Sequence, residues 1–292
     1  MNSANALRGA LVADAATMGL HWMYDQDLLV QLEKSGDLLF RQADLNIYQD
    51  KKAYFAHAAK RSGEYSQYGQ CARIVADLLD KQDQYSTANH REIFFDTFGP
   101  CGSYHGFADR PTKALIARII LDGDDISDLS GSDDDQLPAL CSVPALFYHE
   151  TDHSTVRAAV SVTTINETAI SGALVLHHCL NLLKSEVSLE DALMQSIDSA
   201  NSELASSLKE ALNREPYDPL AAANHFGMPC HMTQGLPLAW YLLKHSTDYE
   251  TVVRDNIRCG GDSCGRAMAV GSVAGLLYGV PDEMKRRVQD RV

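Results

Sequence analysis

The sequence predicts an all-α protein, a single-domain orthogonal helical bundle spanning residues 1–292. Three observations lead to this fold class. Apolar residues recur at helical spacing along most of the chain. Strand signals are few, the best being 159–165, and none is followed by a glycine-rich dinucleotide-binding turn. Hydrophobic residues make up 45% of the chain and charged residues 22%, which is enough apolar material for a large core, and no stretch resembles a long interdomain linker.

The predicted helices follow one another through polar or glycine-containing loops. The helical segments are 4–23, 70–81, 91–98, 111–121, 137–148, 167–184, 188–213, 233–245, 249–259 and 263–278. The main loops are 61–70, 99–110, 122–136, 215–219 and 259–266. The acidic run within 122–136 is most simply a solvated surface loop.

Net charge and cysteine usage limit the partners and the compartment. The formal charge of −14 repels polyphosphate backbones, so nucleic acid is not expected as a partner, although a small anion can still bind at an arginine or a helix N-terminus. The seven cysteines are widely spread and never form a Cys-x-x-Cys pair, which indicates reduced thiols in a cytoplasmic protein. Residues 1–23 carry Asp14 and His21 without a basic leader, so no secretory signal is expected, and no apolar run approaches the ~20 residues of a membrane span.

Small residues recur on one face of the last long predicted helix. They occur every four residues, at Ala267, Gly271, Gly275 and Gly279. Glycine inside a helix costs roughly 1 kcal/mol relative to alanine, and close helix packing supplies the compensation. The first helix has a matching set at Gly9, Ala10, Ala13 and Ala16. We therefore expect the first and last long helices to cross at short range in the core.

The segment 260–266 combines groups suited to chemistry at a helix start. Its two glycines permit a tight turn, and Asp262 or Ser263 can cap the free backbone donors of the helix. Capping alone would explain Asp262. It does not explain a glycine pair, an aspartate, a thiol and an arginine within seven residues.

This segment begins a longer stretch that resembles a known family. Residues 260–279 are similar to the C-terminal signature of the ADP-ribosylglycohydrolase family, which includes dinitrogenase reductase-activating glycohydrolase, the ADP-ribosyl-acceptor hydrolases and the J1-crystallins. Residues 9–19 resemble the family's opening helix, with Asp14 at its Gly-Asp-Ala position. Residues 63–70 lie where the family has Tyr-Thr-Asp-Asp-Thr-Gln, and weaker similarities occur at 102–113 and 133–144. The resemblance spans nearly the whole chain in the family's order.

The resemblance implies magnesium, but the chain departs from the metal-binding pattern. In the family, Thr-Asp-Asp and Asp-x-Asp-Thr segments hold two magnesium ions that orient the ribose. Here Gln67 and Tyr68 replace both aspartates of the first segment, and Cys264 and Gly265 replace the second aspartate and the threonine of the last. Asp262 and Ser66 are the remaining candidate metal ligands. Magnesium prefers hard oxygen ligands that include carboxylates, so a full dinuclear site is not expected.

The retained polar groups predict a divergent pocket. Its expected catalytic carboxylates are Asp262 and Asp135, with Glu64 next, acting on water or on an oxocarbenium-like transition state. Arg266 suits a phosphate, Tyr68 a base or ribose, and Gln67 a sugar hydroxyl. The full set of candidate substrate-binding residues is Ser66, Gln67, Tyr68, Asp134, Gln136, Asn166, Ser263, Cys264 and Arg266.

The resemblance implies a hydrolase that cleaves a glycosidic bond of an ADP-ribosylated protein or a related small nucleotide-sugar. The alternative is a protein without catalysis, either an ADP-ribose or nucleotide binder or a structural, crystallin-like protein. The missing carboxylates favour this alternative, whereas the dense polar pocket argues against a purely structural role.

Two other chemistries are weighed against this interpretation. Residues His149, Glu150 and His153 fit the His-Glu-x-x-His pattern of zinc metallopeptidases, yet the segment looks like the end of one helix and the cap of the next. A cysteine nucleophile is also conceivable. Cys264 would gain a lowered thiol pKa at a helix N-terminus, and Cys230 stands beside His231, but buried structural cysteine is the commoner role.

Overall fold

The computed structural model describes residues 1–82, 84–122 and 131–289. Within these residues the elements are helices, and no strand is present. In chain order they are α1 Ala4–Thr17, η1 Met18–Leu20, α2 Gln26–Ser35, α3 Leu45–Tyr48, α4 Gln67–Lys81, α5 Thr87–Phe98, α6 Arg110–Asp122, η2 Leu137–Leu140, α7 Val143–Tyr148, α8 His153–Val160, α9 Glu167–Lys184, α10 Leu189–Ser196, η3 Ile197–Ser199, α11 Ser202–Asn213, α12 Pro219–Phe226, α13 Met232–Lys244, α14 Tyr249–Arg258, α15 Ser263–Tyr278 and α16 Asp282–Arg287. The all-α prediction is confirmed.

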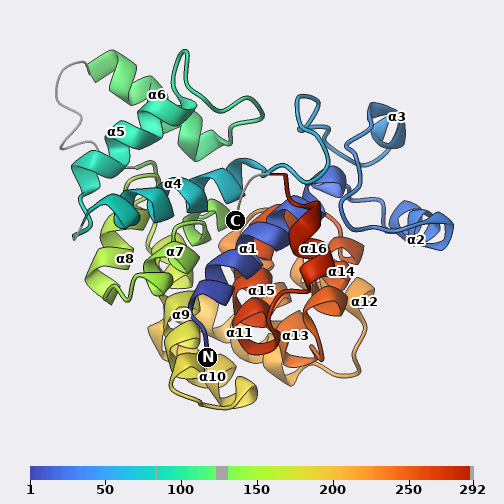
Figure 1. Cartoon of the computed structure of the whole chain (residues 1–292). Coiled ribbons are helices and arrows are strands. Elements are labelled where there is room, and N and C mark those ends of the chain that lie inside the picture. The colour runs from blue at the N-terminus through green and yellow to red at the C-terminus, as the bar shows by residue number, and fades with distance from the viewer. Residues whose placement is uncertain (83, 123–130, 290–292) are drawn as a thin grey trace.

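The centre of the fold is the contact between α1 and α15, which lie side by side in the middle of the molecule (Figure 1). A Cβ atom added at Gly271 would lie 2.5 Å from the carbonyl oxygen of Gly9 and 2.6 Å from Cβ of Ala13. Real Cβ atoms do not come this close to backbone, so glycine is required for the two helices to approach. The close crossing predicted from the repeated small residues is therefore confirmed.

The other helices surround this pair. Helices α4, α7 and α14 pack against α1, while α13, α14 and α9 pack against α15. In Figure 1, α4, α5 and α6 form one flank of the bundle, and the loops around α2 and α3 form the other. The functional consequence is that the C-terminal end of α1 and the N-terminal end of α15 meet in the interior, because the two helices run in opposite directions.

Several predicted elements differ from the observed ones. The strand prediction for 159–165 is wrong, because Val156, Ala159 and Val160 are buried at helical spacing in α8 and the chain then turns. The predicted helix 188–213 is interrupted after η3, where the Asn201 side chain caps α11. The first helix is shorter than predicted, with η1 following α1.

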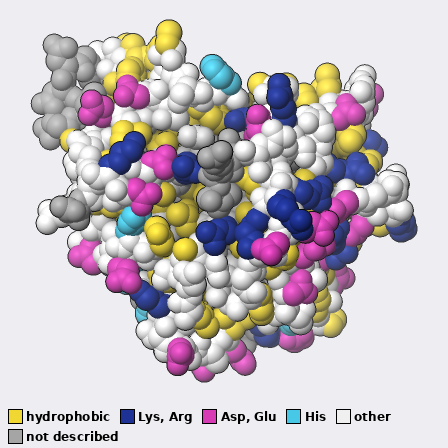
Figure 2. Space-filling model, viewed as in Figure 1, with side chains coloured by type: hydrophobic (Ala, Val, Ile, Leu, Met, Phe, Trp, Pro, Cys, Tyr) yellow, Lys and Arg dark blue, Asp and Glu magenta, His cyan; other side chains and the backbone are white. Residues whose placement is uncertain are grey.

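The surface carries mixed charge. Figure 2 shows basic and acidic side chains interspersed on the face that includes α16. Ion pairs account for part of this pattern, since Asp37 pairs with both Arg254 and Arg287. Among the described residues, no helix combines the length and the hydropathy that a membrane span requires. Of the acidic run in 122–136, residues 123–130 lie outside the described residues.

Candidate functional site

The chain enters α15 through a turn that only glycines fit. Gly260 and Gly261 have φ values of +75° and +66°, the left-handed region. A Cβ at Gly261 would also collide with the backbone of Met228, 2.8 Å from its carbonyl carbon. The next residue, Asp262, caps α15 by accepting from the Gly265 N–H at 2.8 Å. The turn fixes this carboxylate in the interior, where it has 0% exposure.

Asp262 is held by two further donors. Its Oδ1 lies 2.9 Å from Nε2 of His21, and its Oδ2 accepts from the Tyr68 hydroxyl at 3.2 Å. Burial acts to raise the pKa of Asp262 and is the largest single influence. The His21 hydrogen bond and the neighbouring charges outweigh it together, so the pKa is lowered. The surroundings of Asp262 thus favour its ionised form although the side chain is buried.

A second histidine extends this network. Nδ1 of His21 lies 2.8 Å from Nε2 of His57, and both rings are almost completely buried. The other nitrogen of His57, Nδ1, has no hydrogen-bond partner in the described part of the chain. Burial lowers the pKa of His57 well below its usual value. Asp262, His21 and His57 therefore form a continuous buried chain.

Asp14 is the second buried carboxylate in the region where the C-terminal end of α1 meets the N-terminal end of α15. This region is called the junction below. It accepts from the Ser66 backbone N–H at 2.8 Å and from the Ser66 hydroxyl. Ser66 in turn accepts from the Tyr68 N–H at 3.1 Å, which links Asp14 to the residue that holds Asp262. Burial raises the pKa of Asp14 to about 6, because the Ser66 hydrogen bonds offset only part of the desolvation.

Cys264, in the first turn of α15, contacts the C-terminal end of α1. Its Sγ is 3.3 Å from the Thr17 hydroxyl, and the side chain has 0% exposure. We expected the helix N-terminus to lower its thiol pKa, and that expectation is wrong. Burial and the neighbouring Asp14 charge raise the pKa well above its usual value, since desolvation outweighs the helix dipole. Burial likewise raises the pKa of Cys230 to about 12, so the surroundings of both cysteines favour the protonated thiol.

An aromatic cluster separates this network from solvent. Trp22 stacks on His21 with ring centroids 4.1 Å apart, and Tyr54 and Phe107 pack edge-on against Trp22. Trp22 has a φ of 59°, which is uncommon for a bulky residue. Its backbone N–H donates to the Gly261 carbonyl oxygen at 2.8 Å. Tyr54 is 55% exposed, and the Lys113 ammonium lies 4.5 Å from the Phe107 ring centre. The cluster thus presents partly exposed rings next to His21, with a cation beside Phe107.

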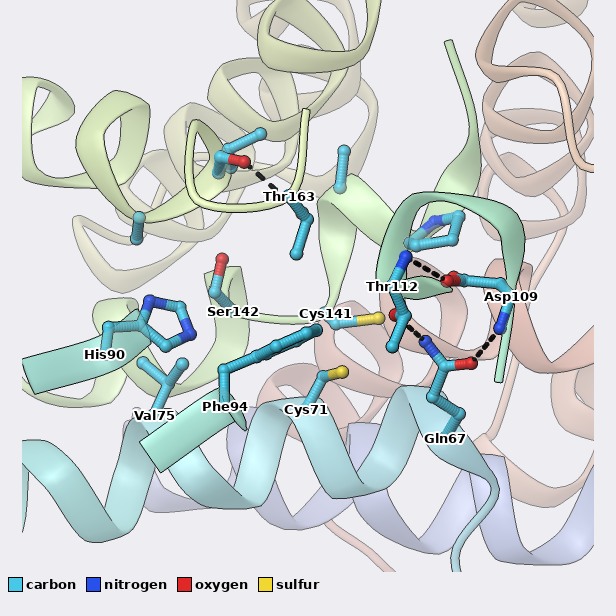
Figure 3. Close-up of a pocket in the computed structure, with 14 residues that line it drawn as sticks. Gln67, Cys71, Val75, His90, Phe94, Asp109, Thr112, Cys141, Ser142 and Thr163 are labelled. Atoms are coloured by element: carbon cyan, nitrogen blue, oxygen red, sulfur yellow. Dashed lines mark hydrogen bonds between the residues drawn. The ribbon is translucent and has the colours of Figure 1, made fainter. Parts of the chain in front are cut away.

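Two hollows lie near the site. One, of about 270 Å3, is lined by Tyr24, Lys52 and Met228 among others. The other, of about 20 Å3, is room for little more than one water and lies behind Gln67. Figure 3 shows Gln67 bridging Asp109 and Thr112 there, with the Cys71 and Cys141 sulfurs at the cavity wall.

The structure brings part of the predicted site together. Ser66, Tyr68, Asp262 and Cys264 meet at the junction of α1, α4 and α15, and Gln67 lies at its edge. Ser263 is buried beside Asp262, and its hydroxyl has no partner in the described part of the chain. Arg266 is different, because its fully buried guanidinium donates to the Asn256 side chain at 2.9 Å and to backbone carbonyls. Arg266 therefore stabilises the turn before α15 through internal hydrogen bonds, and the prediction that it faces a phosphate is not met in this structure.

The remaining predicted residues lie further out. Asp135 is partly exposed beside His231, 3.0 Å away, and Gln136 follows it into η2. The adjacent Leu137 packs on Gly265, which brings this segment to the edge of the junction. Asp134 pairs with Arg110, and Asn166 caps α9 and donates to Asp133 at 2.8 Å. The Glu64 carboxylate accepts from the Arg61 backbone N–H in a surface turn. This partner is outside the junction.

Sequence reasoning missed His21, His57 and Asp109, and it used Asp14 only as a match to the opening helix. His21 follows Asp14 by seven residues, a helical spacing that offered a weak signal. His57 and Asp109 are in loops between helices, where no periodicity marks them. They reach the junction only through the tertiary fold.

The donor set at the junction does not fit a magnesium pair. Both oxygens of Asp262 already accept hydrogen bonds, and Ser66 is committed to Asp14 and Tyr68. Cys264 offers a soft sulfur, and Gly265 offers no side chain. Magnesium needs several hard oxygen ligands in octahedral geometry.

The metallopeptidase pattern does not form a zinc site in the structure. Helix α7 ends at Tyr148, Glu150 has a φ of 56°, and α8 begins at His153. The two histidines therefore do not share one helix face, which that chemistry requires. His149 is instead 3.4 Å from Asp80.

Fold and site together place the chain in a class of helical proteins with a polar junction between the first and last long helices. A solved structure described as an "ADP-ribosylglycohydrolase-related protein complex" has this fold, with a TM-score of 0.72 and 14% identity over 99% of this chain and 92% of that one. Crystallin J1A of Tripedalia cystophora is 24% identical over 94% of this chain and 87% of its own length. The ADP-ribosylglycohydrolase family matches residues 3–292, and the chain belongs to that family.

Proposed function

We propose that this protein hydrolyses a glycosidic bond of an ADP-ribosylated protein or a related nucleotide-sugar, without a magnesium pair. Family membership supports the reaction class. The observation that carries the proposal is Asp262, a fully buried carboxylate whose pKa is lowered at the helix junction. An ionised carboxylate in a low-dielectric site is suited to stabilise an oxocarbenium-like transition state or to accept a proton from water.

Asp14 complements Asp262. Its pKa of about 6 is far above that of an ordinary aspartate, whereas the pKa of Asp262 is lowered. Two carboxylates whose environments separate their pKa values can divide acid and base roles. This division supports hydrolysis by the residues of the chain alone.

The aromatic cluster supports recognition of a nucleotide. Trp22 and Phe107 offer stacking surfaces for adenine or ribose, and Lys113 lies beside Phe107. Lys52 lines the adjacent hollow of about 270 Å3. Both lysines suit the diphosphate of an ADP-ribosyl group in a protein whose overall charge is otherwise strongly negative.

A second candidate function is binding of ADP-ribose without hydrolysis. The observation that favours it is that Asp262 has 0% exposure and that both of its oxygens are occupied by His21, Tyr68 and the Gly265 N–H. A catalytic carboxylate must reach the sugar, so hydrolysis requires Trp22 or Tyr68 to move. Binding at the aromatic cluster requires no such motion.

The test is release of ADP-ribose from modified arginine or serine peptides in magnesium-free buffer. Asp262→Ala should lower the rate at least about 100-fold, because it removes the carboxylate whose pKa is lowered at the junction. Asp248→Ala is the matched control, since Asp248 caps α14 through the Thr251 N–H at 2.8 Å, as Asp262 caps α15. The control should keep full activity.

Three outcomes of this experiment distinguish hydrolysis from binding alone. Release by the intact protein that is lost in Asp262→Ala supports hydrolysis. No release together with ADP-ribose binding that Trp22→Ala weakens assigns binding alone. Neither release nor binding contradicts both functions.

A further inference from the structure

His21, His57 and Cys264 form a buried cluster of soft and borderline metal ligands. One ligand atom from each residue can be chosen so that all three lie within 4.8 Å of one another. All three side chains are at most 3% exposed. They come from three separate segments, the end of η1, a loop before α4, and the first turn of α15, so the fold alone assembles them.

The hydrogen bonds around His21 prepare one nitrogen for a metal. Its Nε2 lies 2.9 Å from the Asp262 carboxylate, a hydrogen-bond acceptor, and is therefore assigned the hydrogen. In the neutral ring this leaves the lone pair on Nδ1, which faces Nε2 of His57 at 2.8 Å. A carboxylate that fixes the tautomer of a histidine ligand is the usual second layer of a zinc site.

The two imidazoles are placed like ligands that share one partner. Two neutral ring nitrogens at 2.8 Å tolerate each other only if one is protonated, and the Nδ1 of His57 is then left buried without a partner within the described residues. A cation between the rings would use both lone pairs. The placement of the three ligand atoms is what points to a metal here, since a cation at Nε2 of His57 leaves its Nδ1 without a partner in the described part of the chain.

We propose that His21, His57 and Cys264 bind a zinc ion in place of the magnesium pair that the family's usual carboxylates would hold. The ligand set of two imidazoles and a thiolate suits zinc and is foreign to magnesium. Tetrahedral zinc places its ligand atoms roughly 3.5 Å from one another, so binding moves the two ring nitrogens, now 2.8 Å apart, slightly away from each other and brings the Cys264 sulfur toward them. The fourth position is open to water or to a nearby oxygen.

The proton balance of binding is simple. The Cys264 thiol loses its proton to solvent as the Zn–S bond forms, which the cation makes favourable despite burial. His57 moves its proton from Nε2 to Nδ1 and keeps its neutral charge. Asp262 still accepts from His21, so its role in the proposed function is unchanged, and the zinc site does not depend on that function.

The test measures metal binding in the absence of ADP-ribose. The intact protein is produced in zinc-supplemented medium and, separately, loaded with cobalt as a spectroscopic probe. We expect one retained zinc per chain, a melting temperature raised by zinc and not by magnesium, and a thiolate-to-cobalt charge-transfer band. Cys264→Ser should abolish the band and weaken zinc retention at least tenfold.

Two further variants keep the test decisive. Cys101→Ser removes an exposed thiol outside the cluster and should leave the metal content and the band unchanged. His57→Gln should weaken binding at least tenfold while keeping the thiol, and it carries the test if Cys264→Ser fails to fold. Absence of retained zinc, or a band that survives in Cys264→Ser or is lost in Cys101→Ser, overturns the proposal.

Discussion

The crossing of α1 and α15 lies next to the junction, where the C-terminal end of α1 meets the N-terminal end of α15. The crossing is made of small residues in close contact, whereas the junction is made of buried polar groups. At the crossing, Gly271 lies against Gly9 and Ala13, and stability comes from close backbone contact. At the junction, carboxylates, histidines and a thiol are buried with 0–3% exposure. Burial of such groups is costly unless each is partnered. The close packing at the crossing therefore holds the two helix ends together around a buried polar cluster.

The largest effect is expected from His21→Leu. The substitution leaves the buried Asp262 carboxylate with the Tyr68 hydroxyl and one backbone donor, so the free energy of unfolding should fall by about 4 kcal/mol. Chemical denaturation measures the loss. His225→Leu is the control, because His225 contacts Glu210 on the surface and should change stability by less than about 1 kcal/mol. Equal losses in the two variants would show that the His21–Asp262 contact has no special role.

Gly271→Val tests the crossing. The valine side chain would collide with the Gly9 backbone and with Ala13, so we expect a loss of more than about 3 kcal/mol. Gly36→Ala is a suitable control, because Gly36 has an extended backbone and only the flexible end of Arg41 nearby. If both variants melt within a degree or two of the intact protein, α1 and α15 do not pack as closely as described.

Asp14→Asn tests the junction through its pH dependence. The pKa of Asp14 is about 6 in the folded protein, above the 3.8 of the unfolded chain, so the folded state binds this proton more tightly. Its contribution to stability is therefore present below about pH 4 and is lost as the pH rises through 6. The loss is up to about 3 kcal/mol.

Urea melts between pH 4 and pH 7 provide the measurement. Asp14→Asn should gain stability relative to the intact protein as the pH rises, because asparagine has no charge to bury. A difference between the two proteins that stays constant across this range would contradict the raised pKa.

The smallest effect is expected from Asp248→Ala. Asp248 caps α14 at the surface, so its loss should cost about 1 kcal/mol and leave the junction intact. Thermal melts of this variant and of Asp262→Ala compare two caps in different surroundings. Asp262→Ala should be the more destabilised of the two, since it also leaves His21 and Tyr68 without their acceptor.

Local patterns in the sequence were sufficient to predict the crossing. The four-residue spacing of Gly271 and Gly275 has one physical explanation, close packing, and the matching set near Gly9 identified the partner helix. The turn at Gly260 and the cap at Asp262 also follow from residue type and position. The turn and the cap depend on neighbours in the chain, and the crossing on a repeat within each helix.

The composition of the junction depends on tertiary structure instead. His57 lies in a loop and contacts His21 across 36 positions, and no sequence period marks such a pair. For Arg266 the sequence suggested an external ligand where the structure shows internal partners. A cation beside the candidate site suggested a phosphate, whereas the guanidinium donates to Asn256 and Gly260, which lie shortly before it in the sequence. The raised pKa of Cys264 was missed because burial outweighs the helix N-terminus.

Calorimetric titration with ADP-ribose, in magnesium-free buffer and again with excess magnesium, tests most directly whether the junction and its aromatic cluster form a magnesium-independent site. We expect binding with the same Kd in both buffers and at least a tenfold weaker Kd for Trp22→Ala. Binding that appears only with magnesium, or no heat in either buffer, would contradict the account.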